Sequence, residues 1–136
     1  MTCWSRESPM HHEISWQVEL TIKAEQFDAF CALTHEMIES TKLEDGVLVY
    51  ERFVSEDGGK VFIYERYANS EAAISHLRSF REQFGEAFGR LVKRERFLVF
   101  GTPSDELKRM LSGFDATFLC RIAGFSALSK DLSNDR

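Results

Sequence analysis

Two charged triplets stand in stretches of the chain that otherwise have the composition of buried strands. The triplet Tyr-Glu-Arg occurs on both sides of a Gly-Gly turn, so that Tyr50 and Arg52 precede the turn while Glu65 and Tyr67 follow it. Alternate residues of a strand face the same side, so each pair shares one face of a sheet. A carboxylate on an enclosed face needs a partner or has a raised pKa, and either state can serve acid–base chemistry. The alternative is a structural ion pair.

A histidine follows the second triplet, in a segment with helical periodicity. His76 lies about 40° around this helix from the apolar Phe80, so its ring can reach the end of the sheet. Imidazole exchanges protons near neutral pH, which makes His76 a candidate general acid or base. The alternative is a boundary histidine bonded to a backbone carbonyl. The candidate catalytic residues are His76 and Glu65, and the candidate substrate contacts are Tyr50, Arg52, Tyr67 and Trp16.

The chain has no pattern that predicts a metal or a cofactor. His12 and His35 each precede a glutamate, but no HxxH, HExxH or CxxC spacing occurs. Gly58 and Gly59 make a turn with no helix start behind them, unlike a phosphate-binding loop. Ser126 lacks the second glycine of a nucleophile elbow. We therefore expect no metal, no cofactor and no hydrolase chemistry.

The elements that must position these residues follow from the spacing of apolar side chains. Apolar residues alternate with polar ones from Ile14 to Ile22, which is typical of a strand with one buried face. A helical stripe then begins near Ala24 and lacks a good N-cap residue. The later segments are two strands at 47–55 and 60–68, a helix capped by Asn69 or Ser70 with a break near Gly85 or Gly89, and a strand at 91–100.

This order, β-α-β-β-α-β, predicts a ferredoxin-like α+β fold, in which two helices cover one face of a four-stranded antiparallel sheet. The chain is long enough for a single domain, 1–136, with its core at about 14–100. Apolar residues occur at both parities of the two hairpin strands, so the open face of the sheet is not suited to water. Burying it against a second copy predicts a homodimer that forms a closed α+β barrel.

The segment that follows adds a C-terminal extension at about 102–128. Thr102 is the predicted N-cap of a short helix, with Pro103 at its first position and Gly113 as its terminator. A fifth strand or arm is expected within "ATFLCRIAGF".

The hairpin register is predicted from its turn. If the turn centres on Gly58 and Gly59, each charge of one triplet meets its opposite in the other. Cross-strand pairs of this kind contribute roughly 0.2 to 1 kcal/mol each. The predicted pairs are Tyr50 with Tyr67, Glu51 with Arg66, Arg52 with Glu65, and Phe53 with Tyr64.

Composition bears on partners and compartment. The formal net charge of −5 and the pI near 5.4 argue against a nucleic-acid partner. The run from Lys93 to Arg96 contains an acid, which is typical of a solvated or ion-paired strand face.

The cysteines and the N-terminus bear on the compartment. Cys3, Cys31 and Cys120 show no CxxC spacing and predict reduced thiols. No apolar run approaches the ~18 residues of a membrane span, and the polar N-terminus is unlike a signal peptide. We therefore expect a cytoplasmic protein without a membrane partner.

The segments "EDGVLVYERF" and "VFIYERYANSEAAISHLRSF" resemble the antibiotic biosynthesis monooxygenase (ABM) family of small dimeric α+β barrel proteins. The resemblance covers roughly residues 14–100 and implies a cavity between the open sheet face and the second helix. Members include cofactor-independent oxygenases of quinols or polyketide-derived phenols, haem-degrading enzymes, an isomerase of a small signalling sugar, and proteins with no known activity. The resemblance therefore implies the fold more narrowly than the reaction.

Four positions of the family motif carry over to this chain. Glu65 matches the sheet carboxylate, Tyr67 the aromatic residue after it, His76 the histidine of the second helix, and Tyr50 the aromatic residue after the glycine. The family position that often holds Trp is Tyr67 here, and the first strand has no Asn. The Asn, Trp and His set of the haem-degrading members is therefore not reproduced, nor clearly the Asn, Trp and Tyr set of the oxygenases.

The resemblance implies a homodimer that binds a small apolar molecule, aromatic or quinol-like, in each subunit. In an oxygenase, His76 or Glu65 would remove a proton from a phenol, the resulting anion would reduce oxygen, and Arg52 would steady the oxyanion. Two other functions stay open, namely non-catalytic ligand binding or regulation in the same cavity, and cofactorless isomerisation of a small metabolite.

Overall fold

The structure is a computed structural model that describes residues 12–127. Its elements are β1 (Ile14–Ile22), α1 (Phe27–Thr41), β2 (Val47–Val54), β3 (Lys60–Tyr67), α2 (Ser70–Gln83), α3 (Gly85–Leu91), β4 (Val92–Phe100), α4 (Asp105–Ser112) and β5 (Thr117–Leu119). The predicted ferredoxin-like α+β order is confirmed, with the second helix divided into α2 and α3 and with α4 and β5 added after β4.

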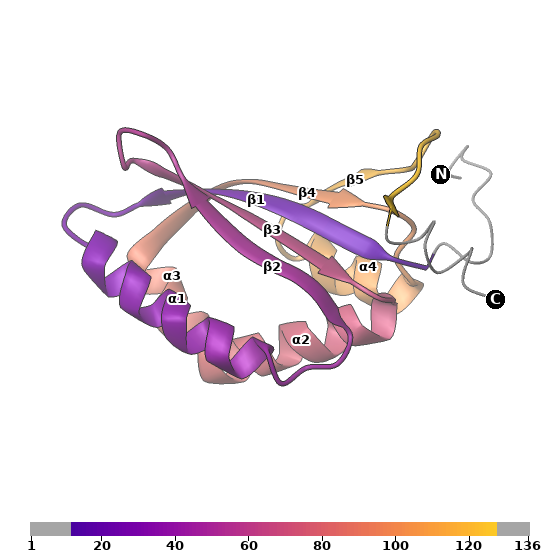
Figure 1. Cartoon of the computed structure of the whole chain (residues 1–136), viewed down its shortest axis with the longest axis horizontal. Helices are drawn as coiled ribbons and strands as arrows, with labels where there is room; N and C mark the ends of the chain where they lie inside the picture. Colours follow the sequence, from indigo (N-terminus) through magenta and orange to yellow (C-terminus); the bar gives the residue numbers. More distant parts are fainter. Residues whose placement is uncertain (1–11, 128–136) are drawn as a thin grey trace.

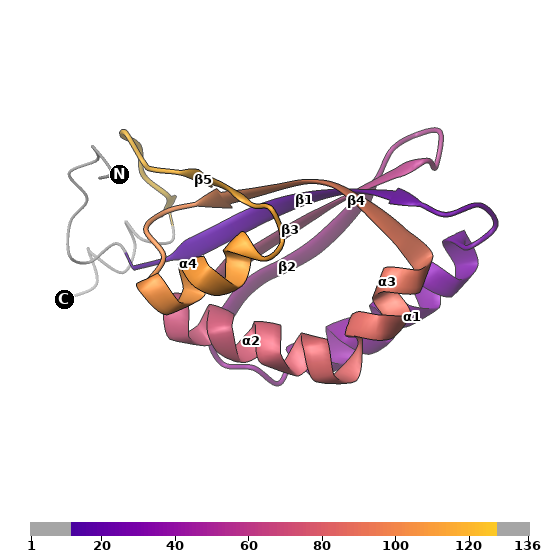
Figure 2. The same ribbon diagram turned by 180° about the vertical axis from the view of Figure 1, so that it is seen from behind.

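The five strands form one sheet in the order β2-β3-β1-β4-β5. All neighbouring strands are antiparallel except β4 and β5, which are parallel. Figures 1 and 2 show the helices on one side of this sheet, with α1, α2 and α3 spread beneath it and α4 at one end. We call the side that faces the helices the inner face and the opposite side the outer face.

The first strand shows how the alternating pattern becomes the core. Ile14, Trp16, Val18 and Leu20 point to the inner face and are at most 6% exposed, while the residues between them are partly exposed. Burying such side chains contributes about 1.5 to 3 kcal/mol each. The period-two pattern of β1 therefore decides which face carries the helices and, with them, any enclosed site.

Two helix starts separate what local sequence predicts from what tertiary contacts decide. Asn69 caps α2, because its side-chain oxygen accepts a hydrogen bond from the backbone N–H of Ala72 at 2.9 Å. The prediction that Thr102 caps the next helix is wrong. Ser104 is the cap of α4, since its hydroxyl accepts from the Leu107 N–H, while its own N–H donates to the hydroxyl of Ser70 at the start of α2.

Gly46 allows the entry to β2 to pass directly against α2. A Cβ atom at Gly46 would lie 2.3 Å from the Cβ of Ala72, a distance that real side chains do not adopt. The Gly46 carbonyl also accepts a hydrogen bond from the Ala68 N–H at 2.9 Å. The loop between α1 and β2 is thereby held close to α2, which matters for the site because that loop carries Glu44.

The predicted hairpin register is wrong by two residues. Tyr50 lies opposite Glu65, and Arg52 lies opposite Ile63. The turn is longer than predicted, because the Ser55 N–H bonds to the Lys60 carbonyl and the Asp57 carboxylate accepts from the Ser55 hydroxyl and the Gly59 N–H. The Asp57 side chain thus stabilises a wider loop than a Gly-Gly turn.

A shift of two residues leaves every side chain on its predicted face, since the side-chain period of a strand is two. Arg52 and Glu65 therefore still meet, as diagonal rather than opposite neighbours, with Nη2 2.7 Å from the carboxylate. The predicted pair of Glu51 with Arg66 does not form. Arg66 instead bonds Glu13 at 2.7 Å.

Two observations bear on the predicted compartment. Cys120 is disulfide-bonded, so the prediction of reduced thiols is wrong for this residue, whereas Cys31 is a free thiol. A disulfide is less common in a reducing compartment, so the cysteines no longer support the expectation of a cytoplasmic protein. Within residues 12–127, no helix combines the length and the apolar character that crossing a bilayer requires.

Candidate functional site

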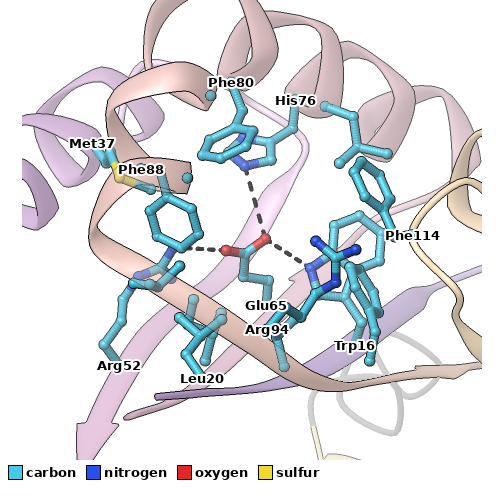
Figure 3. Close-up of a pocket in the computed structure, with 17 residues that line it drawn as sticks. Trp16, Leu20, Met37, Arg52, Glu65, His76, Phe80, Phe88, Arg94 and Phe114 are labelled. Carbon is cyan, nitrogen blue, oxygen red and sulfur yellow. Dashed lines mark hydrogen bonds and ion pairs between the residues drawn. The ribbon is translucent and has the colours of Figure 1, made fainter. Parts of the chain in front are cut away.

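A cavity of about 330 Å³ lies between the inner face of the sheet and helices α2 and α3. Its wall is mostly apolar and is formed by side chains such as Leu20, Met37, Phe80, Phe88, Phe97 and Phe114. Figure 3 shows the polar group of Glu65, Arg52 and His76 with apolar side chains such as Leu20, Phe80, Phe88 and Phe114 around it. The resemblance had implied a cavity between the open face of the sheet and the second helix. The cavity does lie against that helix, but on the face of the sheet that the helices cover. Its volume suits a small organic molecule.

Glu65 is the centre of the polar group. Its carboxylate is buried and accepts hydrogen bonds from the Trp16 Nε1–H at 2.9 Å, from Arg52 Nη2 at 2.7 Å and from the Tyr67 hydroxyl. Burial raises the pKa of Glu65, but the charges of Arg52 and His76 and the hydrogen bonds from Tyr67 and Arg52 outweigh it and leave the pKa below its ordinary value. Glu65 is thus ionised at neutral pH, and its oxygens are occupied by donors.

Arg52 has donors that no described residue satisfies. Its side chain is 8% exposed and lines the cavity, and its guanidinium carbon lies 3.7 Å from the centre of the Tyr50 ring. Nη2 bonds Glu65, whereas Nε and Nη1 are buried without an acceptor among the described residues. Leaving a buried donor unpaired costs about 1 to 3 kcal/mol.

Tyr50 and Tyr67 lie behind the cavity wall and hold the polar group in place. Burial and the nearby charge of Glu65 raise the pKa of Tyr50 to about 12 and the pKa of Tyr67 well above its ordinary value. Both phenols are therefore neutral at physiological pH. The Tyr67 hydroxyl donates to Glu65, whereas the Tyr50 hydroxyl has no hydrogen bond of good geometry among the described residues, and its proximity to Thr41 lowers its pKa.

His76 projects from α2 into the cavity wall and is 4% exposed. Its ring contacts Tyr50 and Tyr67, with ring centres 5.5 and 5.4 Å apart. Nδ1 lies 3.1 Å from the Glu44 carboxylate, and Nε2 lies 3.8 Å from Glu65. When Nδ1–H donates to Glu44, the lone pair of the ring is on Nε2. In this tautomer, Nε2 is the basic atom of the ring.

The structure brings four of the six predicted site residues to the cavity wall, namely Trp16, Arg52, Glu65 and His76, and places Tyr50 and Tyr67 directly behind them. Sequence reasoning missed Glu44, because no local signal relates it to His76. It also missed Arg94 and Phe114, which line the cavity. Within residues 12–127, no three His, Cys, Asp or Glu side chains gather as metal ligands would.

Comparison with a protein-family model gives one match, described as "Antibiotic biosynthesis monooxygenase", over residues 14–94. A curated relative, "Putative monooxygenase Rv0793" of Mycobacterium tuberculosis, is 38% identical over 69 residues, which cover 47% of this chain and 68% of the relative. The matched family region contains Trp16, Arg52, Glu65 and His76.

Solved structures with the same fold extend the comparison. MupZ from Pseudomonas fluorescens has a TM-score of 0.76 and 26% identity, over 85% of this chain and 94% of that protein. A structure described as "Putative antibiotic biosynthesis monooxygenase" from Bacteroides thetaiotaomicron has a TM-score of 0.57 and 26% identity, over 62% of this chain and 84% of that protein. The likeness to MupZ therefore reaches beyond the region that the family model matches.

Proposed function

Because the chain belongs to the antibiotic biosynthesis monooxygenase family, we propose that it is a cofactor-independent monooxygenase. Its substrate would be a small aromatic or quinol-like compound bound in the inner cavity. The observation that carries this proposal is the joint position of a basic imidazole nitrogen and an unsatisfied guanidinium. His76 and Arg52, two of whose nitrogens have no acceptor among the described residues, line the same cavity, whose wall is otherwise mostly apolar.

The first step is removal of a proton from the hydroxyl group of the substrate. His76 Nε2 accepts the proton, and Glu44 stabilises the imidazolium through Nδ1–H. The negative charge that develops on the substrate oxygen is neutralised by Nε or Nη1 of Arg52. Glu65 is the weaker candidate for the base, since its pKa is lowered and its oxygens already accept three donors. It instead holds Arg52 in place.

The second step is oxidation of the electron-rich anion by dioxygen. For a ring methylene, one oxygen atom of O₂ forms the new carbonyl, and the other leaves as water with the two hydrogens that the carbon loses. The substrate supplies all the electrons, so the balance needs no reductant other than the substrate. The aromatic wall, which includes Phe80 beside His76 and Phe88 beside Arg52, excludes water from the reactive anion.

Oxygen consumption tests this proposal. We expect the protein to consume dioxygen with at least one member of a panel of anthrones, naphthols and hydroquinones, and to place one atom of isotope-labelled O₂ in the product. An Arg52→Met variant is the matched comparison, because it removes the guanidinium but keeps an apolar side chain of similar length. No uptake with any panel member, combined with tight binding of the same compounds, would instead indicate a binding module.

The convergence of polar groups favours a second candidate, a cofactorless isomerase. Glu65, Arg52 and His76 meet at one end of the cavity, and such an arrangement can remove and return a proton without oxygen. Under nitrogen in deuterium oxide, an isomerase would incorporate deuterium into its substrate and yield an isomer. A strict requirement for oxygen in product formation would exclude it.

The outer face of the sheet supports the proposal of a homodimer. Aromatic and aliphatic side chains of four strands gather there, and Phe53 and Leu119 are 57% and 38% exposed. A second copy presents the same surface and can bury it by two-fold symmetry. The set comprises Phe53, Phe62, Tyr64, Leu98, Phe100 and Leu119.

Light scattering at micromolar concentration tests the dimer. We expect twice the chain mass of 15.7 kDa, and a shift toward monomer when a charge is placed on the outer face by Phe53→Asp. Leu43→Asp is the control, since Leu43 is 83% exposed but follows α1 on the helical side. A monomer mass for the unaltered protein would overturn the proposal.

A further inference from the structure

An irregularity in β4 turns a guanidinium toward the cavity. Phe97 lies opposite Val18 on the inner face, and Arg96 lies opposite Glu19 on the outer face. Regular alternation would then place Glu95 inward and Arg94 outward. The register shifts between Glu19 and Leu20, so that Glu95 is an extra residue and Arg94 pairs with Leu20 on the inner face. Bulges re-aim side chains in this way next to functional sites.

Arg94 is the additional charged residue of the cavity wall beyond the polar group of Glu65, Arg52 and His76. Its guanidinium carbon lies 5.2 Å from the centre of the Phe114 ring, and Phe114 is stacked on Phe97. Figure 3 shows Arg94 and Arg52 on either side of Glu65. Within the described part of the chain, Arg94 has no ion pair, whereas its neighbour Arg96 is 3.8 Å from Glu19.

Gly89 also lines the cavity and leaves open space beside it. A Cβ atom there would meet nothing within 4 Å, and the residue has no left-handed backbone that would require glycine. Glycine is unfavourable inside a helix, so neither packing nor α3 itself explains it. Gly89 and Arg94 line the cavity and are both exposed, so each lies where the cavity wall meets solvent.

We propose that the exposed part of the cavity wall at Arg94 and Phe114 binds a carboxylate of the substrate. The substrate class is then an aromatic hydroxy acid, with its hydroxyl group at Arg52 and His76 and its carboxylate at Arg94. The orientation of the hydroxyl rests on the proposed function, but recognition of the acid does not. Among the residues that line the cavity, Arg52 balances the charge of Glu65, so the guanidinium of Arg94 attracts a negatively charged group.

Equilibrium binding of two matched probes tests this inference. The probes are 6-hydroxy-2-naphthoate and 2-naphthol, which share the ring and hydroxyl group and differ in the carboxylate. Binding is followed by calorimetry or by tryptophan fluorescence, without turnover. We expect the unaltered protein to bind the acid about tenfold more tightly than the naphthol, since a charge-assisted contact at a partly exposed site has about that effect. Arg94→Met should abolish this preference and leave the affinity for the naphthol unchanged.

Arg96→Met is the matched control, because it removes the same charge two residues away on the outer face and should keep the preference. Arg94→Lys retains the positive charge and should keep part of the preference for the acid. Equal affinity of the unaltered protein for both probes, no detectable binding of either at millimolar concentration, or an unchanged preference in Arg94→Met would each overturn the inference. If the unaltered protein prefers the acid but consumes no oxygen with any compound of the panel, the proposed oxidation alone would be overturned.

Discussion

Replacing His76 with asparagine is expected to lower the rate of the proposed oxidation by about 100- to 10,000-fold, the range for loss of a general base. The asparagine amide can occupy the position of Nδ1 and keep the hydrogen bond to Glu44, but it offers no basic atom in place of Nε2. Substrate binding should change little, because the apolar wall and Arg52 remain. Oxygen consumption measured alongside probe affinity separates the two effects.

Glu44→Gln is the matched variant for the same experiment. It keeps the size of the side chain and a partner for Nδ1 but removes the negative charge that stabilises the imidazolium. We expect a loss of about 10- to 100-fold, the range for residues that orient a catalytic group, and a changed dependence of the rate on pH. Full activity of His76→Asn would exclude His76 as the base and leave Glu65 as the remaining candidate.

Replacing Glu65 with leucine is expected to lower the free energy of unfolding by about 3 to 5 kcal/mol, the cost of leaving one member of a buried ion pair without its partner. The Arg52 guanidinium would lose the acceptor of its one described hydrogen bond, and the donors of Trp16 and Tyr67 would lose the same acceptor. Urea denaturation at neutral pH measures the effect, with an unchanged slope confirming that the same unit unfolds.

Adding Arg52→Met to Glu65→Leu provides the control. The double variant removes both charges and should be more stable than Glu65→Leu alone, since an apolar pair of similar volume can replace a buried ion pair. The recovery should be incomplete, because the Trp16 and Tyr67 donors stay buried without an acceptor. A double variant as unstable as Glu65→Leu would show that the ion pair is not the source of the loss.

The same carboxylate predicts how stability depends on pH. The pKa of Glu65 is lower in the folded protein than its ordinary value of about 4.3. Its contribution to stability is therefore fully present above about pH 4.3 and is lost as the pH falls through the lower folded-state pKa. Glu65→Gln cannot lose this contribution, so its stability should fall less steeply over that acidic interval than that of the unaltered protein.

Much of the framework follows from local patterns. The alternation in β1 predicts its inner face, and the parity of Arg52 and Glu65 places them on that face whichever register the hairpin adopts, provided the shift is even. Helical periodicity likewise predicts that His76 lies at the edge of the apolar stripe of its helix, and the ring therefore faces the cavity. Periodicity is a property of neighbouring residues and survives errors in the pairing of strands.

The errors arose where a side chain or a distant segment decides the backbone. Asp57 bonds the turn and widens it, which moved the hairpin register by two residues. Ser104 became a helix cap because Ser70, far away in the sequence, binds its N–H. Neither contact has a periodic signal, so neither could be deduced from composition or spacing.

The sequence by itself determined the order of the elements, the face on which Arg52, Glu65 and His76 lie, and through its motifs the family. Only the tertiary structure decided which atoms of these residues are free to act. The loop held against α2 at Gly46 brings Glu44 to His76, and the bulge in β4 turns Arg94 inward. Both depend on contacts between segments that are distant in the chain, because the close packing of two backbones and the count of residues between paired strands are set only when the whole sheet forms.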